Sequence, residues 1–292
     1  MGKALADAYP AARAVFDEVD EALGEPLSQL CWEGPEDALT LTANAQPALM
    51  AHSLAAFRVL QAEGLATHDA ASFAGHSLGE YSAHCAAGTF SLADTARLLR
   101  VRGEAMQAAV PVGEGGMAAI LGLDLTVVEA LADEAGVQVA NDNAPGQVVV
   151  SGRKDAVAAA CDAAKASGAK RALPLPVSAP FHCDLMQPAA ERMAEALAEV
   201  AINAPDRPVY ANVLAAPVPG PEVAASLVRQ VTGRVRWTET VRAMAADGTT
   251  LFVEVGTGKV LSGLVRRIER GLQAVSVGAP LDLDALRDAT QH

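Results

Sequence analysis

Apolar side chains recur with a helical period in two stretches of the first sixty residues. In residues 10–23 the apolar positions fall three and four residues apart. In residues 47–60, Leu49, Phe57 and Leu60 share one stripe with smaller side chains between them. We therefore predict a helix in each stretch.

A short apolar run is followed at once by a helical pattern in the next part of the chain. Residues 70–75 predict a buried strand and residues 77–87 a helix, which Gly88 can end because glycine readily adopts a left-handed conformation. Ser91, with Asp94 three residues later, resembles a capping box that opens a further helix to about residue 110. The first of these units is a strand, a sharp turn and a helix.

Between residues 113 and 180 the pattern changes to shorter elements. Along the chain these are a strand at 117–121, a helix at 126–135, strands at 137–140 and 147–151, a helix at 155–166 and a strand at 171–177. The order β-α-β-β-α-β is typical of a ferredoxin-like unit. We therefore predict an inserted small subdomain.

The remainder of the chain returns to longer helices. We predict helices at 185–200, 223–231 and 259–270, a strand at 251–255 and an irregular proline-rich stretch at 204–221. The predicted fold class is α/β, with an α/β-hydrolase-like large subdomain built on a parallel sheet and a ferredoxin-like insertion. Residues 1–112 and 183–292 would form the large subdomain, and residues 113–182 the small one.

Composition agrees with an α/β enzyme. Hydrophobic residues make up 51% of the 292 residues and aromatic residues only 4%, which suits Ala-rich helices packed on short Val-rich strands. The apolar runs fall far short of the roughly 20 residues that cross a bilayer. The first residues carry no apolar secretion signal. We expect a cytoplasmic protein that does not span a membrane.

The net charge and the cysteine content argue against nucleic-acid partners, zinc sites and disulfide frameworks. The formal net charge of −13 disfavours nucleic acid as a partner, because phosphate binding needs a basic face. The four cysteines lie far apart and include no Cys-x-x-Cys pair, which argues against a zinc site and a disulfide framework. We expect buried or unreactive thiols and no metal site.

The strongest local signal for chemistry is the pentapeptide Gly75-His76-Ser77-Leu78-Gly79. It is a G-x-S-x-G motif placed between a predicted strand and a predicted helix, as a nucleophile elbow requires. The two glycines would flank a cramped turn that side chains would obstruct. Such a turn exposes the Ser77 hydroxyl at a helix N-terminus and leaves the Leu78 N–H free to face a developing oxyanion.

A serine nucleophile needs a base, which directs attention to the six histidines. Four of them lie in predicted helices, in a polar connection or at the chain end: His52, His84, His68 and His292. His76 adjoins Ser77 and would point elsewhere. His182 lies where the small subdomain returns to the large one, and such junctions form clefts. From its position alone, His182 could equally be a catalytic base or an ordinary loop histidine.

Several longer motifs, in the same order along the chain, resemble one family. They are Gly75-His76-Ser77-Leu78-Gly79-Glu80-Tyr81, Val101-Arg102-Gly103, NDNAPGQVVVSG at 141–152, KRALPLPVSAPFH at 170–182 and EVGTGKVL at 254–261. This set is similar to malonyl-CoA:acyl carrier protein transacylase, and the likeness extends from about residue 46 to residue 267. The motifs are too long and too specific for a chance match.

The resemblance implies a role for each matching residue. Ser77 would be the nucleophile and His182 the base that takes its proton and later returns one to the departing thiol. Arg102, twenty-five residues after Ser77, would hold the free malonyl carboxylate. A charge-assisted pair of this kind contributes about 1.5 to 3 kcal/mol, or roughly one to two orders of magnitude in selectivity over acetyl. Without the resemblance, Arg102 would be interpreted as a surface arginine on a helix.

The resemblance assigns supporting roles as well. The backbone carbonyl of Gln230 would orient His182 in place of an acid, and the Leu78 N–H would be an oxyanion donor. Gln46 matches a glutamine near the pocket, with a simple helix-start residue as the alternative. Phe181 resembles the variant found in malonyl rather than methylmalonyl pockets, because its bulk would crowd an α-methyl group. Asn143 falls on the cleft strand of the small subdomain and receives no catalytic step.

The chain departs from the family pattern at its start. Family members begin with an apolar strand and a Gly-Gln-Gly-Ser-Gln loop that supplies the second oxyanion donor, and this sequence contains neither. We therefore expect the sheet to lack a strand and the oxyanion hole to keep only the Leu78 donor. Loss of one such donor typically costs about 10²- to 10³-fold in rate, so weak catalysis is expected.

The predicted activity is transfer of a malonyl group from coenzyme A to the phosphopantetheine thiol of acyl carrier protein, for fatty acid or polyketide synthesis. Malonyl-CoA is a substrate, and no bound cofactor is implied. An α/β-hydrolase such as a thioesterase shares the elbow, but its histidine follows an acid near the chain end, whereas His182 comes 105 residues after Ser77. The other alternative is an inactive homologue that only binds carrier protein.

An acidic carrier protein would require positive charge concentrated locally on this acidic chain. The candidates are Lys170, Arg171, Arg229, Arg234, Arg236, Arg266 and Arg267. An equally open interpretation is that these are ordinary solvated surface charges.

Overall fold

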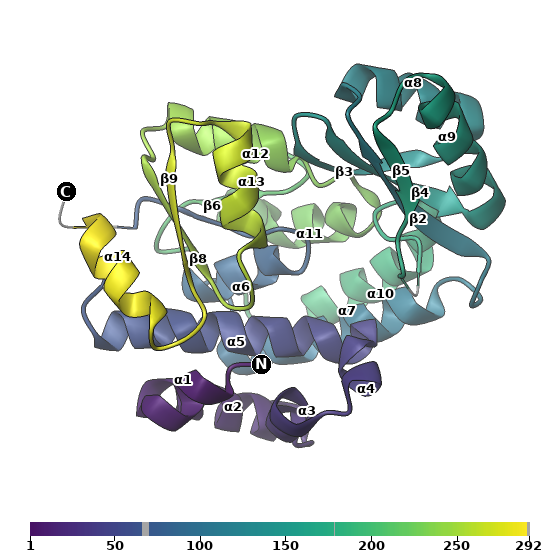
Figure 1. The fold of residues 1–292 in the computed structure, drawn as a ribbon. Helices are drawn as coiled ribbons and strands as arrows, with labels where there is room; N and C mark the ends of the chain where they lie inside the picture. Colours follow the sequence, from purple (N-terminus) through teal and green to yellow (C-terminus); the bar gives the residue numbers. More distant parts are fainter. Residues whose placement is uncertain (66–69, 178, 291–292) are drawn as a thin grey trace.

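The computed structural model describes residues 1–65, 70–177 and 179–290. Helices surround short parallel strands in the larger part, and an antiparallel sheet with two helices forms the smaller part (Figure 1). The N-terminal elements are α1 (Lys3–Ala8), α2 (Pro10–Leu23), α3 (Leu27–Glu33), α4 (Glu36–Thr40), α5 (Thr42–Ala62), β1 (Phe73–Ala74), α6 (Gly79–Ala86) and α7 (Leu92–Ala108). The predicted α/β fold is confirmed.

The helical pattern at the start of the chain is confirmed in α2 and α5. One face of α2 carries the buried Ala12, Val15, Phe16 and Val19, and α2 packs against both α5 and α7. In Figure 1, α5 runs beneath the strands as the longest element of this layer. Its start at Thr42 precedes the predicted start at 47, because Pro47 is accommodated inside the helix.

The strand, turn and helix predicted around residue 77 are present, although the strand is shorter than expected. β1 pairs in parallel with β6 (Val209–Ala211), Phe73 opposite Val209 and Ala74 opposite Tyr210. Gly88 has a positive φ of 76°, which ends α6 as predicted. The Ser91 side chain accepts a hydrogen bond from the Asp94 N–H at 3.0 Å and caps α7. Both boundary predictions are confirmed.

The smaller part has the predicted β-α-β-β-α-β order. Its elements are β2 (Gly115–Leu121), α8 (Leu125–Ala135), β3 (Gln138–Ala144), β4 (Gln147–Arg153), α9 (Lys154–Ala166) and β5 (Arg171–Pro174). The strands are antiparallel in the order β3-β4-β2-β5. Val148 and Val150 of β4 are buried with Ile120 of β2 in a core that α8 and α9 cover. This core is separate from that of the larger part.

The C-terminal part completes the larger unit. Its elements are a 3₁₀ turn (Asp184–Met186), α10 (Gln187–Ala198), β6, β7 (Ala216–Pro217), a 3₁₀ turn (Gly220–Glu222), α11 (Val223–Thr232), α12 (Trp237–Ala246), β8 (Leu251–Val255), α13 (Val260–Ile268), β9 (Gln273–Val277) and α14 (Asp282–Thr290). β8 pairs in parallel with β9, in a sheet separate from β1-β6-β7. The predicted parallel pairing is therefore present in two sheets.

The prediction of an irregular stretch at 204–221 was wrong at two short strands, β6 and β7. The three residues of β6 are all buried. Three residues are too few to show a period, and the prolines around them obscure the strand. Pro208 lies just before β6, where its missing N–H costs nothing and its carbonyl accepts from the Phe73 N–H at 2.8 Å. The other elements that were not predicted are α1, α3, α4, α12, β9 and α14.

The two parts are joined along one edge of the small sheet. Asn141 of β3 forms a parallel bridge with Val235. The Asp142 N–H donates to Val235 O at 2.9 Å, and the Val235 N–H donates to Ala140 O at 2.8 Å. The Arg236 N–H donates in turn to Asn212 O at 3.0 Å. This seam fixes β3 against the segments that follow β6 and α11.

Candidate active site

Ser77 lies on a sharp turn between β1 and α6, in a left-handed backbone conformation with φ 54°. A non-glycine residue adopts this conformation rarely and at a cost. Gly75 makes the turn possible, because a Cβ there would lie 2.0 Å from the backbone C and O of Gly79. A Cβ on Gly79 would meet open space. The expectation that both glycines are sterically required is therefore met only by Gly75.

Two side chains from distant segments hold the backbone of Ser77. The Ser77 N–H donates to Asn212 Oδ1 at 2.7 Å, and Asn212 Nδ2 donates to Gly75 O at 2.7 Å. Gln230 Nε2 donates to Ser77 O at 2.8 Å. These bonds satisfy the polar groups of a strained turn and stabilise it.

The base predicted for Ser77 is within reach. The Ser77 hydroxyl lies 2.8 Å from His182 Nε2. His182 Nδ1 lies 2.9 Å from Gln230 O and 3.1 Å from Gly233 O. Since carbonyl oxygens only accept, Nδ1 carries the proton and Nε2 accepts from the Ser77 O–H. The geometry matches a nucleophile, a base and an orienting group, with a backbone carbonyl as the orienter.

His182 is kept neutral by its surroundings. Burial, together with the nearby Arg102 cation, lowers its pKa to about 3. The carbonyls of Gln230 and Gly233 oppose this shift. His182 also has a positive φ of 58°. A neutral imidazole at pH 7 is the form that can accept the serine proton.

Arg102 lies beside the nucleophile rather than on the surface. Its side chain is buried, with 1% exposed, and Nη2 lies 3.2 Å from Ser77 Oγ. Gly103 makes this placement possible, because a Cβ there would lie 2.6 Å from the Ala43 Cα and the Thr42 carbonyl of α5. α7 therefore approaches α5 closely where Arg102 enters the site.

Two glutamines orient the Arg102 guanidinium. Nη1 donates to Gln46 Oε1 at 2.7 Å, and Nη2 donates to Gln230 Oε1 at 2.9 Å. The guanidinium carbon lies 5.6 Å from the centre of the Tyr81 ring. Nε has no hydrogen-bond partner among the described residues. The cation is therefore held in place by neutral groups, with Nη2 directed at the Ser77 hydroxyl.

Sequence reasoning missed three parts of this site. Asn212 follows a strand that was not predicted, and the side chain of Gln230 acts in addition to its carbonyl. Glu80 is fully buried and accepts hydrogen bonds from Asn212 and Gln230. A signal was available for Gln230, because it lies within the buried stripe of the amphipathic α11. A buried Glu directly after the elbow gave no comparable signal.

The Leu78 N–H remains free for an incoming oxygen. It lies at the start of α6, and among the described residues it donates no hydrogen bond. Phe181 is half-buried and packs against the cores of both parts. Asn143 Oδ1 lies 2.7 Å from His76 Nε2, so it contacts the neighbour of the nucleophile rather than Ser77 itself.

The remaining histidines have other partners. His52 lies between Thr257 and Gly278, with ring nitrogens 2.7 and 2.8 Å from their oxygens. His84 is buried beside Thr89. His76 contacts the Trp237 ring. His68 and His292 lie outside the described residues. Among the described histidines, His182 is therefore the one that contacts Ser77.

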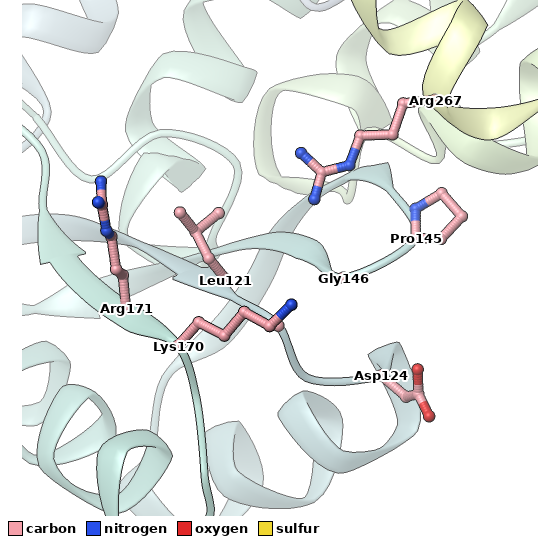
Figure 2. A pocket seen from close by; sticks show the side chains of 8 residues that line it. Leu121, Asp124, Pro145, Gly146, Lys170, Arg171 and Arg267 are labelled. Atoms are coloured by element: carbon pink, nitrogen blue, oxygen red, sulfur yellow. The ribbon is translucent and has the colours of Figure 1, made fainter.

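Some of the candidate basic residues line a hollow at one end of the small sheet, where β2 ends and β5 begins, about 450 Å³ in volume. Figure 2 shows Arg267 entering from α13, with Lys170 and Arg171 at the start of β5. The described part of the chain contains no ion pair for any of the three. In a second hollow, of about 660 Å³, two of the lining arginines are in ion pairs, because Arg234 and Arg236 pair with glutamates.

Among the described residues, the cysteines form no disulfide and the acidic residues form no metal-binding group. All four cysteines are buried and free of disulfides. Within residues 1–65, 70–177 and 179–290, no group of three or more His, Cys, Asp or Glu is arranged to hold a metal ion. No helix of that part of the chain combines the length and apolarity needed to cross a membrane.

Comparison with known proteins agrees with this geometry. Residues 1–281 match the family described as the acyl transferase domain. Malonyl CoA-acyl carrier protein transacylase of Bacillus subtilis strain 168 is 47% identical over 96% of this chain and 89% of its own length. The protein of the same name from Escherichia coli K12 is 47% identical over 94% of this chain and 90% of its own length.

Solved structures are similar over nearly the whole chain. The acyl-carrier-protein-S-malonyltransferase of Bartonella henselae has a TM-score of 0.96 and 54% identity, covering 100% of this chain and 95% of its own. A malonyl-transacylase solved in complex with its type II polyketide synthase acyl-carrier protein has a TM-score of 0.96 and 42% identity, covering 99% of this chain and 94% of its own.

Proposed function

This chain belongs to the acyl transferase family, and on that premise we propose that it moves a malonyl group from coenzyme A to the phosphopantetheine thiol of an acyl carrier protein. The observation that carries the proposal is the meeting of three groups at one hydroxyl. Ser77 Oγ lies 2.8 Å from His182 Nε2 and 3.2 Å from Arg102 Nη2. A nucleophile, a base and a carboxylate-binding cation therefore share one site.

The first half of the reaction acylates the enzyme. The malonyl carboxylate pairs with Arg102, which brings the thioester carbonyl to Ser77 Oγ. As Oγ attacks the carbonyl carbon, its proton passes to His182 Nε2. The carbon–sulfur bond then breaks, and His182 returns the proton to the departing thiolate. The products are free coenzyme A and malonyl-Ser77.

The second half reverses these steps on a new thiol. The phosphopantetheine thiol gives its proton to His182 and attacks the ester carbonyl, and Ser77 leaves with that proton. In both halves the oxyanion lies at the N-terminus of α6, where the free Leu78 N–H can donate to it. The imidazolium that forms in each half is stabilised by the carbonyls of Gln230 and Gly233.

The two rival functions are disfavoured by particular contacts. A hydrolase triad would place a carboxylate on the orienting nitrogen of the histidine, whereas Nδ1 of His182 contacts two backbone carbonyls. An inactive binding protein has no need for a base on the nucleophile, yet Ser77 and His182 lie within hydrogen-bond distance. The first contact disfavours the hydrolase, and the second disfavours the inactive homologue.

Further assignments belong to this proposal. Phe181 limits the space next to the malonyl α-carbon, and Gln46 holds Arg102 through Nη1. The chain forms two subdomains, one of residues 1–112 with 183–292 and one of residues 113–182, and their separate hydrophobic cores support this division.

The basic hollow lined by Lys170, Arg171 and Arg267 receives the acidic carrier protein. A cytoplasmic location completes the proposal, and cell fractionation tests it.

The proposal is tested by intact mass after brief mixing with malonyl-CoA and, separately, with acetyl-CoA. We expect one malonyl group on the protein, little acetyl, and no adduct on Ser77→Ala. Ser82→Ala is the matched control, since Ser82 lies on the same helix and its hydroxyl has no hydrogen-bond partner among the described residues. An adduct that survives Ser77→Ala, or no adduct on the unaltered protein, would refute it.

A further inference from the structure

Glu80 is a buried carboxylate to which the proposed mechanism gives no step. It lies in the first turn of α6, three residues after Ser77, with none of its surface exposed. Oε2 accepts from the Asn212 N–H at 2.9 Å and from Gln230 Nε2 at 2.8 Å. Oε1 has no partner among the described residues. Burying a carboxylate is costly, so its presence here calls for a reason.

The amide of Gln230 lies between two groups of opposite charge. Nε2 donates to Glu80 Oε2 and to Ser77 O, both at 2.8 Å. Oε1 accepts from Arg102 Nη2 at 2.9 Å. Turning the amide over would place its NH₂ against the guanidinium and its oxygen against the carboxylate. The two charges therefore select one orientation of this amide.

Glu80 also reaches Ser77 by a second route. Its Oε2 holds the Asn212 N–H, and Asn212 Oδ1 accepts from the Ser77 N–H at 2.7 Å. One carboxylate oxygen thus anchors both residues that bind the backbone of the nucleophile. The charge of Glu80 also attracts Arg102, which raises the pKa of that arginine against the lowering effect of its burial.

We propose that Glu80 is a positioning residue that fixes the Gln230 amide, and through it sets the Arg102 guanidinium for the malonyl carboxylate and the Ser77 turn for attack. This inference rests on the proposed function. It assigns the selectivity for malonyl over acetyl to two residues: Arg102, which contacts the carboxylate, and Glu80, which positions Arg102 through Gln230. Burial raises the pKa of Glu80 to about 7, opposed by its two hydrogen bonds and by Arg102, so the test is run at pH 8.

The test is the ratio of acylation kcat/KM for malonyl-CoA to that for acetyl-CoA. A purely structural role would lower the amount of folded enzyme equally for both donors and would leave the ratio unchanged. We expect Glu80→Gln to lower the ratio about tenfold, because the neutral amide no longer dictates the direction of Gln230 and misplaced groups lose up to about 10²-fold. Glu80→Ala should lower the ratio at least as much.

Cys85→Ala is the control, because Cys85 is buried on the same helix and outside this hydrogen-bond network. It should lower the melting temperature and leave the ratio at the value of the unaltered protein. If Glu80→Ala does not fold, the isosteric Glu80→Gln decides alone. A ratio within twofold of the unaltered protein in Glu80→Gln overturns the role of Glu80. An unaltered protein that forms no malonyl adduct overturns the proposed function, and this inference with it.

Discussion

Ser77 and His182 both have positive φ angles, 54° and 58°, and they meet at 2.8 Å. Non-glycine residues keep such conformations only where their surroundings impose them. Here Asn212 and Gln230 hold Ser77 by both backbone groups, and Gln230 O holds the His182 ring. These hydrogen bonds stabilise a strained backbone arrangement in which the Ser77 hydroxyl lies within reach of its base.

Arg102→Ala should remove most of the discrimination between acyl groups. The kcat/KM for malonyl-CoA should fall by about 10- to 100-fold, since a charge-assisted contact contributes about 1.5 to 3 kcal/mol, and the value for acetyl-CoA should fall far less. Arg97→Ala is the control, because Arg97 lies on the same helix with its side chain 56% exposed. Equal losses for the two donors would contradict the role of Arg102.

The buried His182 should make the protein less stable in acid. Its pKa of about 3 in the folded state lies below about 6.5 in the unfolded chain. Between these values the unfolded state binds one more proton than the folded state, so the stability that His182 contributes is present above the unfolded pKa of about 6.5 and declines as the pH falls below it. From pH 7.5 to 5, this histidine removes about 2 kcal/mol of unfolding free energy.

Urea unfolding of the unaltered protein and of His182→Gln at these two pH values measures that contribution. The loss on acidification should be about 2 kcal/mol smaller in the variant, while the other histidines contribute equally to both proteins. Identical losses would mean that His182 is not buried in its neutral form.

The element that matters most is the unit of β1, turn and α6. The sequence predicted it because G-x-S-x-G falls between an apolar run and a helical pattern. It did not predict β6, which pairs with β1, because three residues among prolines show no period. Asn212 follows β6 directly, so its contact with Ser77 could not be foreseen. The role of Glu80 and that of the Gln230 side chain were missed for a related reason, since only tertiary structure brings α6 and α11 together.

The two glycines of the elbow should respond differently to substitution. Gly75→Ala would place a Cβ 2.0 Å from the backbone of Gly79, so we expect destabilisation of about 3 kcal/mol or more and loss of acylation. Gly79→Ala adds a Cβ in open space at the start of α6. Its stability should change by no more than about 1 kcal/mol. Urea unfolding and adduct formation check both, and equal tolerance would contradict the geometry of the turn.

At the scale of the whole molecule, an acidic protein must bind acidic partners. The formal charge is −13, yet Lys170, Arg171 and Arg267 line one hollow together (Figure 2). The net charge left open whether the basic residues gather at one place or are ordinary solvated surface charges. Which ones gather depends on how α13 packs beside the small sheet, and on which arginines pair with glutamates, as Arg234 and Arg236 do.

Reversing the charge of this hollow should weaken the carrier-protein step. The double variant Lys170→Glu, Arg171→Glu should have a KM for carrier protein about tenfold above that of the unaltered protein at low salt. The two KM values should approach each other as added salt screens the charges. Acylation by malonyl-CoA should stay within about threefold. Lys154→Glu, an exposed change on the same subdomain, is the control. An unchanged KM would remove the hollow from the docking surface.

In the proposed mechanism, malonyl-Ser77 is an intermediate from which the carrier protein takes the malonyl group. The most direct measurement isolates the malonylated enzyme, free of malonyl-CoA, and mixes it with carrier protein that bears the phosphopantetheine arm. We predict that the malonyl group leaves Ser77 and appears on the carrier protein, and that it stays on the enzyme when that arm is absent. Release as free malonate at a rate independent of carrier protein would contradict this mechanism and identify a hydrolase.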